Sequence, residues 1–199
     1  MMTKDELLAP LARVRGDAVV VTTMAAVRAW GRHSTSELDF ASADSAMGHA
    51  ADLALGIALA QPARKVICLN GDGSMLMSLG TLVTIVEAGA RNLVLFVLEN
   101  RTYEITGNQR VPGAGSVDFA ALARGAGFKR TYHFESADDC ARHMAEVVTG
   151  EGPVLVVASM APGEDRPLRR GPREPERYLQ ASLAESAHRL RQALRESKN

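Results

Sequence analysis

The residues with the clearest chemical potential are a carboxylate, Asp72, and a side-chain amide, Asn100. Asp72 lies in the glycine-rich turn 71–74, and Asn100 follows an apolar run. Glycines let a backbone approach a ligand closely, and the N–H groups at the start of a helix bind phosphate. A carboxylate in such a turn repels phosphate unless a cation lies between them. Because Mg²⁺ binds carboxylate, carbonyl and phosphate oxygens, the two residues predict a magnesium–diphosphate site.

These two residues must be positioned by a strand, a turn, a helix and a second strand. Residues 65–70 form an apolar run, helical spacing continues from the turn to about Gly89, and a second apolar run covers 92–98. A right-handed crossover places such strands side by side and parallel. Asp72 and Asn100 then lie at the carboxyl ends of neighbouring strands, where open α/β sheets bind ligands. The alternative is an ordinary turn and an asparagine that only ends a strand.

The rest of the chain continues this alternation of strands and helices. Further strands are predicted at 17–22, 129–134 and 153–160, and helices at 3–14, 23–30, 47–60, 117–126, 136–149 and 176–196. This pattern predicts an α/β fold in three layers, with an open, mostly parallel sheet of about five strands between helices. We expect a globular domain over 1–160, an exposed or surface-bound Pro/Arg-rich connector over 161–175, and a C-terminal helix within 176–199. That helix would pack on the sheet domain or on a partner.

Composition narrows the classes of function. The 199 residues are 46% hydrophobic and carry no formal net charge, so nothing in their balance favours nucleic acid or a membrane surface as a partner. Cys68 and Cys140 lack metal-like spacing and are predicted to be reduced thiols in or near the core. No signal-peptide pattern stands at the start, and no apolar run approaches the roughly 18 residues that span a bilayer. A cytoplasmic location is therefore expected.

Two motifs resemble the diphosphate-binding domain of thiamine-diphosphate enzymes. The first is Gly-Asp-Gly-Ser at 71–74 with its helix, second strand and closing Asn100. The second is the pattern Asn-x-x-Tyr-x-x-Thr-Gly-x-Gln over 100–109, which is similar to that of sulfopyruvate and phosphonopyruvate decarboxylases. This chain departs from that pattern at Asn108, where glycine is usual, and at Glu99, where Asn or Asp is common. Neither departure removes an expected metal ligand.

The resemblance implies roles for individual residues. Mg²⁺ would be held by Asp72, Asn100 and the Thr102 carbonyl, the last on the resemblance alone. The diphosphate would lie on the turn 71–74, with the backbone N–H groups of Gly73 and Ser74 beside Gly71. The remaining implied contacts are the Ser45 carbonyl with the aminopyrimidine, Met47 beneath the bent cofactor, Tyr103 and Ile105 against cofactor or substrate, and His49 toward substrate. Met47 could instead fill the core, and His49 could equally be a packing residue.

Other features of the active region are open to two interpretations. Thr22 and Thr23 follow a predicted strand, so they could line a substrate pocket or cap the next helix. The segment 101–115 is polar and glycine-containing, and it predicts an active-site loop or lid rather than a strand. A sulfonate or phosphonate tail on the substrate would favour cationic groups, for which Arg101, Arg110 and His49 are the candidates. The identity of the 2-oxo acid does not follow from these residues.

The resemblance covers residues 15–160 and only one half of a thiamine-diphosphate enzyme. The other half is a pyrimidine-binding domain, which supplies a glutamate to the cofactor. We therefore expect that glutamate on a partner chain, in a hetero-oligomer such as α₂β₂ or larger, as in two-subunit sulfopyruvate decarboxylases. The implied activity is decarboxylation of a small 2-oxo acid with thiamine diphosphate and Mg²⁺. Alternatives are a 2-oxoacid:ferredoxin oxidoreductase β subunit, an acetolactate synthase-like carboligase, and a non-catalytic assembly subunit.

Overall fold

A six-stranded parallel sheet forms the centre of the computed structural model, which describes residues 1–42 and 47–196. Its order is β2-β1-β3-β4-β8-β7, and every neighbouring pair in it is parallel. The strands are β1 (Val19–Thr22), β2 (Asp39–Ala41), β3 (Val66–Gly71), β4 (Leu93–Glu99), β7 (Arg130–Phe134) and β8 (Val154–Ser159). The predicted α/β architecture is confirmed. The sheet has one strand more than expected, because β2 is only three residues long and begins with an aspartate.

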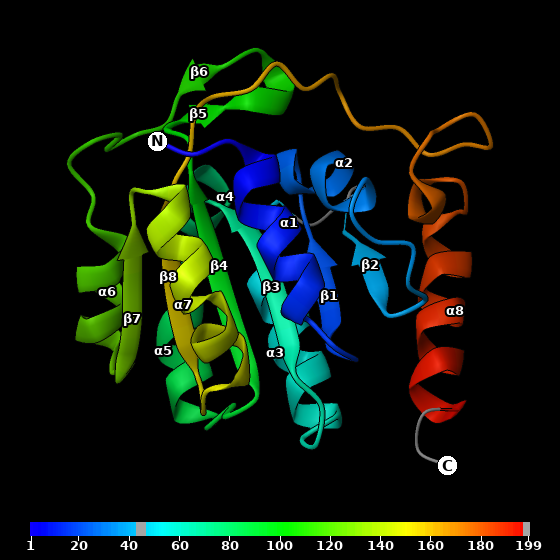
Figure 1. The fold of residues 1–199 in the computed structure, drawn as a ribbon, viewed down its shortest axis with the longest axis horizontal. Helices are drawn as coiled ribbons and strands as arrows, with labels where there is room; N and C mark the ends of the chain where they lie inside the picture. The colour runs from blue at the N-terminus through cyan, green and yellow to red at the C-terminus, as the bar shows by residue number, and fades with distance from the viewer. Residues whose placement is uncertain (43–46, 197–199) are drawn as a thin grey trace.

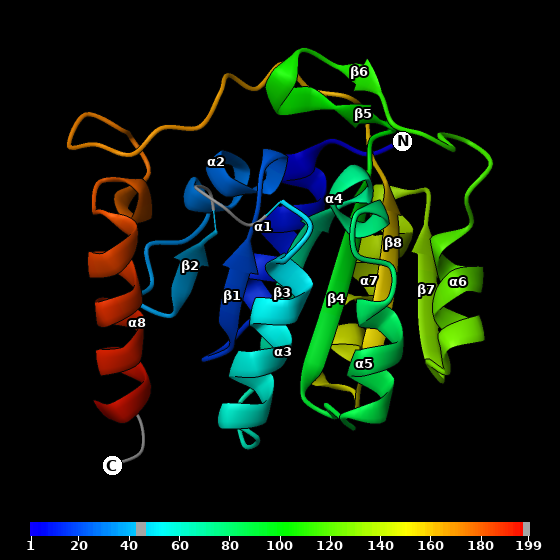
Figure 2. The ribbon, with the colours of Figure 1, turned by 180° about the vertical axis from the view of Figure 1, so that it is seen from behind.

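Helices cover both faces of this sheet (Figures 1 and 2). One face packs against α1 (Lys4–Val14), α2 (Ala25–Gly31) and α7 (Ala137–Thr149), and the other against α3 (Ala50–Ala60), α5 (Thr81–Glu87) and α6 (Phe119–Ala126). Side chains alternate between the two faces along each strand. In β3, for example, Ile67 and Leu69 join the first core, whereas Val66 and Cys68 join the second. Both layers of helices are therefore attached to the same strands.

Several helix ends follow the capping residues of the sequence. Thr3 and Glu6 form a reciprocal capping box at the start of α1, as the sequence predicts. Asp118 caps α6 through the backbone N–H of Ala121 at 2.9 Å. Ser136 stands at the N-cap of α7, as expected, but its side chain makes no capping hydrogen bond.

The helix after the glycine-rich turn differs from its prediction. Instead of one helix to Gly89, the chain forms α4 (Asp72–Leu76), a turn, and then α5. In the turn, Ser78 N–H donates to the Met75 carbonyl at 3.2 Å and Thr81 N–H donates to the Ser78 carbonyl at 3.0 Å. These are three-residue steps, and serine and Gly80 are weak helix formers, so the α-helical ladder is interrupted here. The apolar spacing of the two short helices is nevertheless continuous enough to resemble one long helix.

The segment 101–115 contains more regular structure than predicted. Strands β5 (Thr102–Tyr103) and β6 (Gln109–Arg110) form a small antiparallel ribbon, joined by the 3₁₀ helix Glu104–Thr106. The prediction of a loop without strands was wrong here, because two-residue strands leave no periodicity in a sequence. The ribbon lies above the carboxyl edge of the sheet (Figure 1).

The connector that follows β8 crosses this same edge to reach the last helix (Figure 1). It leads through the 3₁₀ helix Arg177–Leu179 into α8 (Leu183–Glu196), which packs beside β2 at the end of the sheet. Leu190 of α8 is buried in the core on that side. Near the other terminus, Met2 forms a β-bridge with Met160, which brings the start of α1 to the carboxyl edge.

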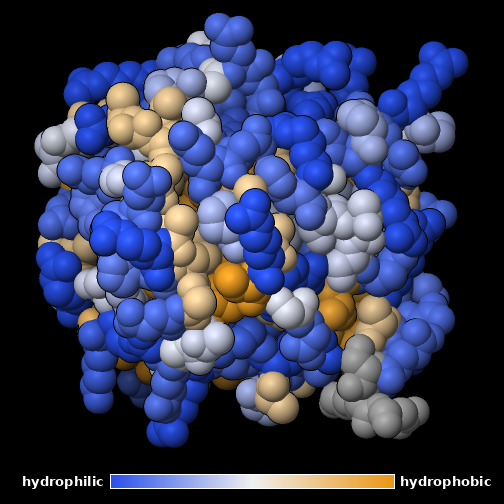
Figure 3. All heavy atoms as spheres, in the orientation of Figure 1, coloured by the Kyte–Doolittle hydropathy of each residue, from blue (hydrophilic) through white to orange (hydrophobic). Residues whose placement is uncertain are grey.

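In the face that Figure 3 shows, hydrophilic side chains predominate and hydrophobic ones gather in separate patches. Across residues 1–42 and 47–196, none of the helices combines the length and the apolar character needed to cross a membrane.

Candidate functional site

The two residues singled out first from the sequence lie side by side at the carboxyl edge of the sheet. Strands β3 and β4 are parallel neighbours, with Gly71 opposite Leu98, so Asp72 and Asn100 follow adjacent strand ends. A hydrogen bond ties the two ends directly, because the Arg101 N–H donates to Oδ2 of Asp72 at 2.7 Å. The geometry expected from a crossover unit is therefore present.

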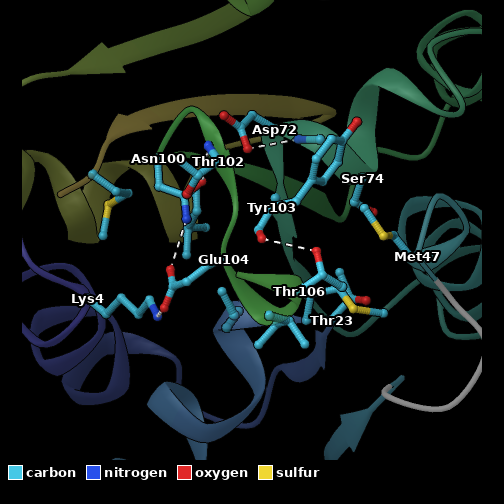
Figure 4. A pocket seen from close by; sticks show the side chains of 18 residues that line it. Lys4, Thr23, Met47, Asp72, Ser74, Asn100, Thr102, Tyr103, Glu104 and Thr106 are labelled. Atoms are coloured by element: carbon cyan, nitrogen blue, oxygen red, sulfur yellow. Dashed lines mark hydrogen bonds and ion pairs between the residues drawn. The ribbon is translucent and has the colours of Figure 1, made fainter. Parts of the chain in front are cut away.

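A pocket with a cavity of about 70 Å³ opens at this edge. Its wall is mostly apolar, with a few polar groups from the strand ends (Figure 4). It is lined by Lys4, Thr23, Met24, Ala25, Ala26, Met47, Gly71, Asp72, Gly73, Ser74, Leu98, Asn100, Thr102, Tyr103, Glu104, Ile105, Thr106 and Met160. Segments far apart in the sequence thus meet there: the N-terminus, the turn after β1, the Met47 segment, the glycine-rich turn, the end of β4 with the following segment 102–106, and Met160.

Asp72 is a buried carboxylate whose charge is only partly compensated. It is 3% exposed, and it accepts hydrogen bonds from the N–H groups of Gly73 at 2.8 Å and Arg101 at 2.7 Å. Within the described ranges, no Lys, Arg or His side chain forms an ion pair with it. Burial is the main cause that raises the pKa of Asp72, and the charge of Glu99 acts in the same direction. A divalent cation beside this carboxylate would supply the missing positive charge, so the residue fits a metal-binding role.

Asn100 presents its amide in a defined orientation. Its Nδ2 donates to Oε2 of Glu104 at 2.9 Å, and its Oδ1 accepts from the Thr102 N–H at 3.1 Å. Asn100 is 7% exposed, and Thr102 is half-buried in the pocket wall. A carboxylate, an amide oxygen and a nearby backbone carbonyl make the oxygen set that Mg²⁺ prefers. In the described part of the chain, no group of three His, Cys, Asp or Glu side chains offers a second metal site.

The glycine-rich turn is packed closely against the ribbon. A Cβ atom at position 73 would overlap the ring of Tyr103, whereas one at Gly71 would meet nothing within 4 Å. Ser74 is 2% exposed and its hydroxyl accepts the Gly48 N–H at 2.8 Å, which attaches the segment of Met47 to this turn. The turn, Met47 and Tyr103 therefore surround one part of the pocket.

The remaining predicted residues divide into several groups. Ile105 lines the pocket, as the resemblance implies. Ser45 lies outside the described residues. His49 does not line the pocket: its side chain is 71% exposed and its Nδ1 lies 2.9 Å from Oδ2 of Asp52. Arg101 and Arg110 are exposed.

The two threonines after β1 do not cap the next helix. The N-cap of α2 is Met24, at a φ of 47° and without a side-chain cap. Thr22 instead shares a hydrogen bond with the Tyr178 hydroxyl at 3.1 Å, and Thr23 donates to the Ser42 carbonyl at 3.3 Å. Thr23 also lines the pocket, so the pocket interpretation fits this residue better than the capping interpretation.

Two polar residues of the pocket were not predicted from the sequence. Glu104 is 4% exposed, and its Oε1 lies 2.5 Å from Nζ of Lys4 in α1. Glu104 lies within the 100–109 motif, and its place between motif residues is the one signal that could have indicated it. Lys4 gives no such signal, because the two residues are 100 positions apart in the chain.

A family match relates the chain to enzymes that use thiamine pyrophosphate, and individual relatives are named as decarboxylases. Residues 19–158 match the family described as thiamine pyrophosphate enzyme, C-terminal TPP binding domain. A phosphonopyruvate decarboxylase of Streptomyces viridochromogenes is 36% identical over 165 residues, which are 80% of this chain and 39% of that protein. Sulfopyruvate decarboxylase subunit beta of Methanothermobacter thermautotrophicus is 38% identical over 117 residues, 59% of this chain and 60% of that subunit.

Solved structures show the same fold. The thiamine diphosphate-dependent 4-hydroxybenzoylformate decarboxylase of Rhodococcus jostii RHA1 has a TM-score of 0.69 at 24% sequence identity, over 82% of this chain and 33% of that chain. The matched part of the chain spans 39% of the phosphonopyruvate decarboxylase and 33% of the 4-hydroxybenzoylformate decarboxylase. The family match spans most of the described sheet and includes the pocket turn and the ribbon. On that match, the chain belongs to the thiamine pyrophosphate enzymes, as their C-terminal TPP-binding domain.

Proposed function

We propose that this chain is the diphosphate-binding β subunit of a heteromeric, thiamine diphosphate- and Mg²⁺-dependent decarboxylase of small 2-oxo acids. The observation that carries the proposal is the buried Asp72 carboxylate, which lies beside Asn100 at the carboxyl ends of two parallel strands and opens into a pocket. Relatives named as phosphonopyruvate and sulfopyruvate decarboxylases support the reaction class. Relatives named as β subunits support a partner chain.

The residues of the pocket divide into those that hold the cofactor and those that face substrate. Asp72, Asn100 and the Thr102 carbonyl would hold Mg²⁺, and the turn 71–74 would receive the diphosphate. Met47 would support the cofactor from the α3 side, together with the Ser45 carbonyl. When bound, thiamine diphosphate provides an electron sink for the bond that breaks as CO₂ leaves. These side chains would contribute binding, orientation and exclusion of water, and the partner's pyrimidine-binding domain would contribute the catalytic glutamate.

The substrate side is formed by the ribbon and the turn after β1. Tyr103 packs against the glycine-rich turn, and Ile105, Thr23 and Met24 also line the pocket. The wall is mostly apolar, which favours a compact substrate and a poorly hydrated reaction site. Lys4 lines the pocket, but its charge already pairs with Glu104 and Asp165, so it is not a free cation for a substrate tail. Arg101 and Arg110 are exposed and remain candidates for binding a substrate tail, whereas His49 does not line the pocket.

Calorimetric titration tests the cofactor site. Thiamine diphosphate with Mg²⁺ is titrated into the chain alone and then into the chain mixed with a pyrimidine-domain partner subunit. We expect binding that needs Mg²⁺ and strengthens with the partner. Asp72→Ala should weaken it at least about 100-fold, because the metal loses its charged ligand. Glu87→Ala, which removes an exposed carboxylate on α5, is the matched control and should bind as the unmodified chain does.

The outcomes separate the proposal from its alternatives. Undiminished binding by Asp72→Ala would overturn the site assignment. No binding even with the partner would favour a non-catalytic assembly subunit. A panel of 2-oxo acids with the reconstituted complex then tests the reaction, which should release CO₂ and an aldehyde. An acyloin product would indicate a carboligase instead, and reduction of a viologen dye with CoA would indicate an oxidoreductase.

A further inference from the structure

Glu104 is a buried carboxylate to which three different parts of the chain are attached. Its side chain is 1% exposed. Oε2 accepts the Asn100 amide at 2.9 Å, while Oε1 accepts the Lys4 ammonium at 2.5 Å and the Asp165 N–H at 3.2 Å. Figure 4 shows Lys4, Glu104 and Asn100 in a row along one side of the pocket. The ammonium group offsets the charge of this carboxylate, which would otherwise be buried without a cationic partner.

The contact with Glu104 decides which way the Asn100 amide faces. An ionised carboxylate only accepts hydrogen bonds, so the amide must turn its NH₂ group toward Glu104. Its Oδ1 is thereby turned to the other side, where it accepts the Thr102 N–H at 3.1 Å. Rotation of the amide by half a turn would place two oxygens against each other at Glu104. The carboxylate therefore holds the Asn100 oxygen in one orientation.

A second contact restrains Thr102. The Thr102 hydroxyl donates to Oδ1 of Asn108 at 2.8 Å, and the Asn108 Nδ2 donates to the Gly163 carbonyl at 2.9 Å. Asn108 has a φ of 60°, a left-handed conformation in which glycine is common and asparagine is tolerated. With an asparagine at this position, the turn keeps its backbone and gains a side-chain link from Thr102 to the connector.

The connector approaches both contacts at Gly163 and Asp165. A Cβ atom at position 163 would overlap the carboxylate of Glu104, so only glycine allows the chain to pass there without displacement. Asp165 adds an ion pair to Lys4 at 2.7 Å. The bridge between Met2 and Met160 brings the N-terminus and the start of the connector to the same place. Lys4, Glu104, Asn108, Gly163 and Asp165 together are called the connector clamp below.

We propose that the connector clamp positions the Asn100 and Thr102 oxygens for Mg²⁺, and that the segment after β8 therefore helps to form the cofactor site. This inference rests on the proposed function. Glu104, Asn108 and their partners act as positioning residues, because they orient the ligands and do not themselves touch the metal. Residues that orient metal ligands typically change metal affinity about 10–100-fold when they are altered.

Two variants test the clamp without altering an expected ligand. Asn108→Gly keeps a residue that adopts positive φ and removes both side-chain contacts. Gly163→Ala pushes the connector away from Glu104 and leaves Glu104 itself in place. Glu174→Gln is the matched control, because it removes the charge of a connector ion pair with Arg28 at 3.4 Å, away from the pocket. All three changes are small and largely outside the core, which favours folded proteins.

Two measurements are made on each variant. Hydrogen exchange of the chain without cofactor or metal reports on the backbone of 100–110, and we expect about tenfold faster exchange there in Asn108→Gly and Gly163→Ala. Titration of Mg²⁺ at saturating thiamine diphosphate, with the partner subunit present, should show about tenfold or greater loss of Mg²⁺ affinity in the same two variants. Glu174→Gln should match the unmodified chain in both.

Failure of this inference differs from failure of the proposed function. If the unmodified complex binds Mg²⁺ and cofactor and both clamp variants bind equally well, the clamp has no positioning role and the proposed function stands. If the affinity falls but exchange in 100–110 is unchanged, the ligands are not held through these contacts, which also overturns the inference. If the unmodified complex binds neither, the proposed function fails and the inference fails with it.

Discussion

The ring of Tyr103 packs against the backbone of Gly73, in the turn that leads from β3 into α4. The approach is so close that a Cβ atom at position 73 would overlap the ring. Gly73 has no positive φ, so the requirement for glycine here is one of space and not of backbone conformation. This contact attaches the ribbon of β5 and β6 to the turn that we expect to receive the diphosphate.

Replacing Gly73 by alanine should therefore disrupt the site. The added methyl group must displace Tyr103 or move the turn, so we expect at least about tenfold weaker binding of thiamine diphosphate with Mg²⁺, together with a loss of stability of about 1–3 kcal/mol. Calorimetry and urea unfolding measure the two effects. Gly80→Ala is the control, since a Cβ atom there meets nothing within 4 Å. Equal binding by both variants would contradict the importance of this contact.

Asp39 and Arg15 form a buried ion pair, and breaking it should strongly lower the free energy of unfolding. The Arg15 Nη1 lies 3.1 Å from the Asp39 Oδ1, and the two side chains are 8% and 2% exposed. Asp39→Asn leaves the arginine without its charged partner and should cost about 3–5 kcal/mol of unfolding free energy. The control is Glu151→Gln, which breaks an exposed pair with Arg91 and should cost about 0.5 kcal/mol or less. Urea denaturation at pH 7 compares them, and similar midpoints would refute the prediction.

Cys68 and Cys140 should be unreactive in the folded protein. Both are fully buried, and burial raises the pKa of Cys140 to about 11 and that of Cys68 well above its usual range. At pH 8 only about one Cys140 thiol in 1,000 is then ionised. As long as the pH stays below the pKa, raising it by one unit increases this fraction about tenfold. We expect no labelling by DTNB at pH 8 before unfolding and two thiols after unfolding in urea. Rapid labelling of either thiol in the native protein would be inconsistent with this burial.

Leu190 attaches the C-terminal helix to the sheet. It is 6% exposed and belongs to the core that contains Phe40 of β2. Leu190→Ala should cost about 2–4 kcal/mol, because it leaves a cavity between α8 and the sheet. Arg191→Ala, which alters an exposed neighbour, should change stability by about 0.5 kcal/mol or less. Thermal or urea unfolding measures the stability of both variants. A negligible loss of stability in Leu190→Ala would mean that α8 contributes little to the stability of the chain.

The α/β architecture and the centre of the site could be predicted because their signals are local. Apolar runs predict buried strands, capping residues predict helix starts, and the turn 71–74 indicates where a strand passes into a helix. Parallel strands joined by a crossover must bring Asp72 and Asn100 to one edge. The predicted pocket residues Met47, Thr102, Tyr103 and Ile105 also line the cavity. Their roles toward a cofactor stay predictions until binding is measured.

Other features were decided by contacts that no local pattern encodes. β2 forms because it pairs with β1. The break between α4 and α5 follows from turn hydrogen bonds at Ser78 and Thr81. The ribbon forms because two short strands pair, with Thr102 opposite Arg110. His49 could belong to the pocket by its position in the sequence, yet the structure turns it toward Asp52 and solvent.

The sequence by itself determined the parallel sheet, the strand ends that carry Asp72 and Asn100, and the family resemblance, since each depends on short-range periodicity or on a motif. Only the tertiary structure decided that Lys4 and the connector meet at Glu104. That meeting depends on the bridge between Met2 and Met160, which joins the two ends of the domain. Contacts between residues so far apart are set by how the layers pack as a whole, and no spacing within the chain records them.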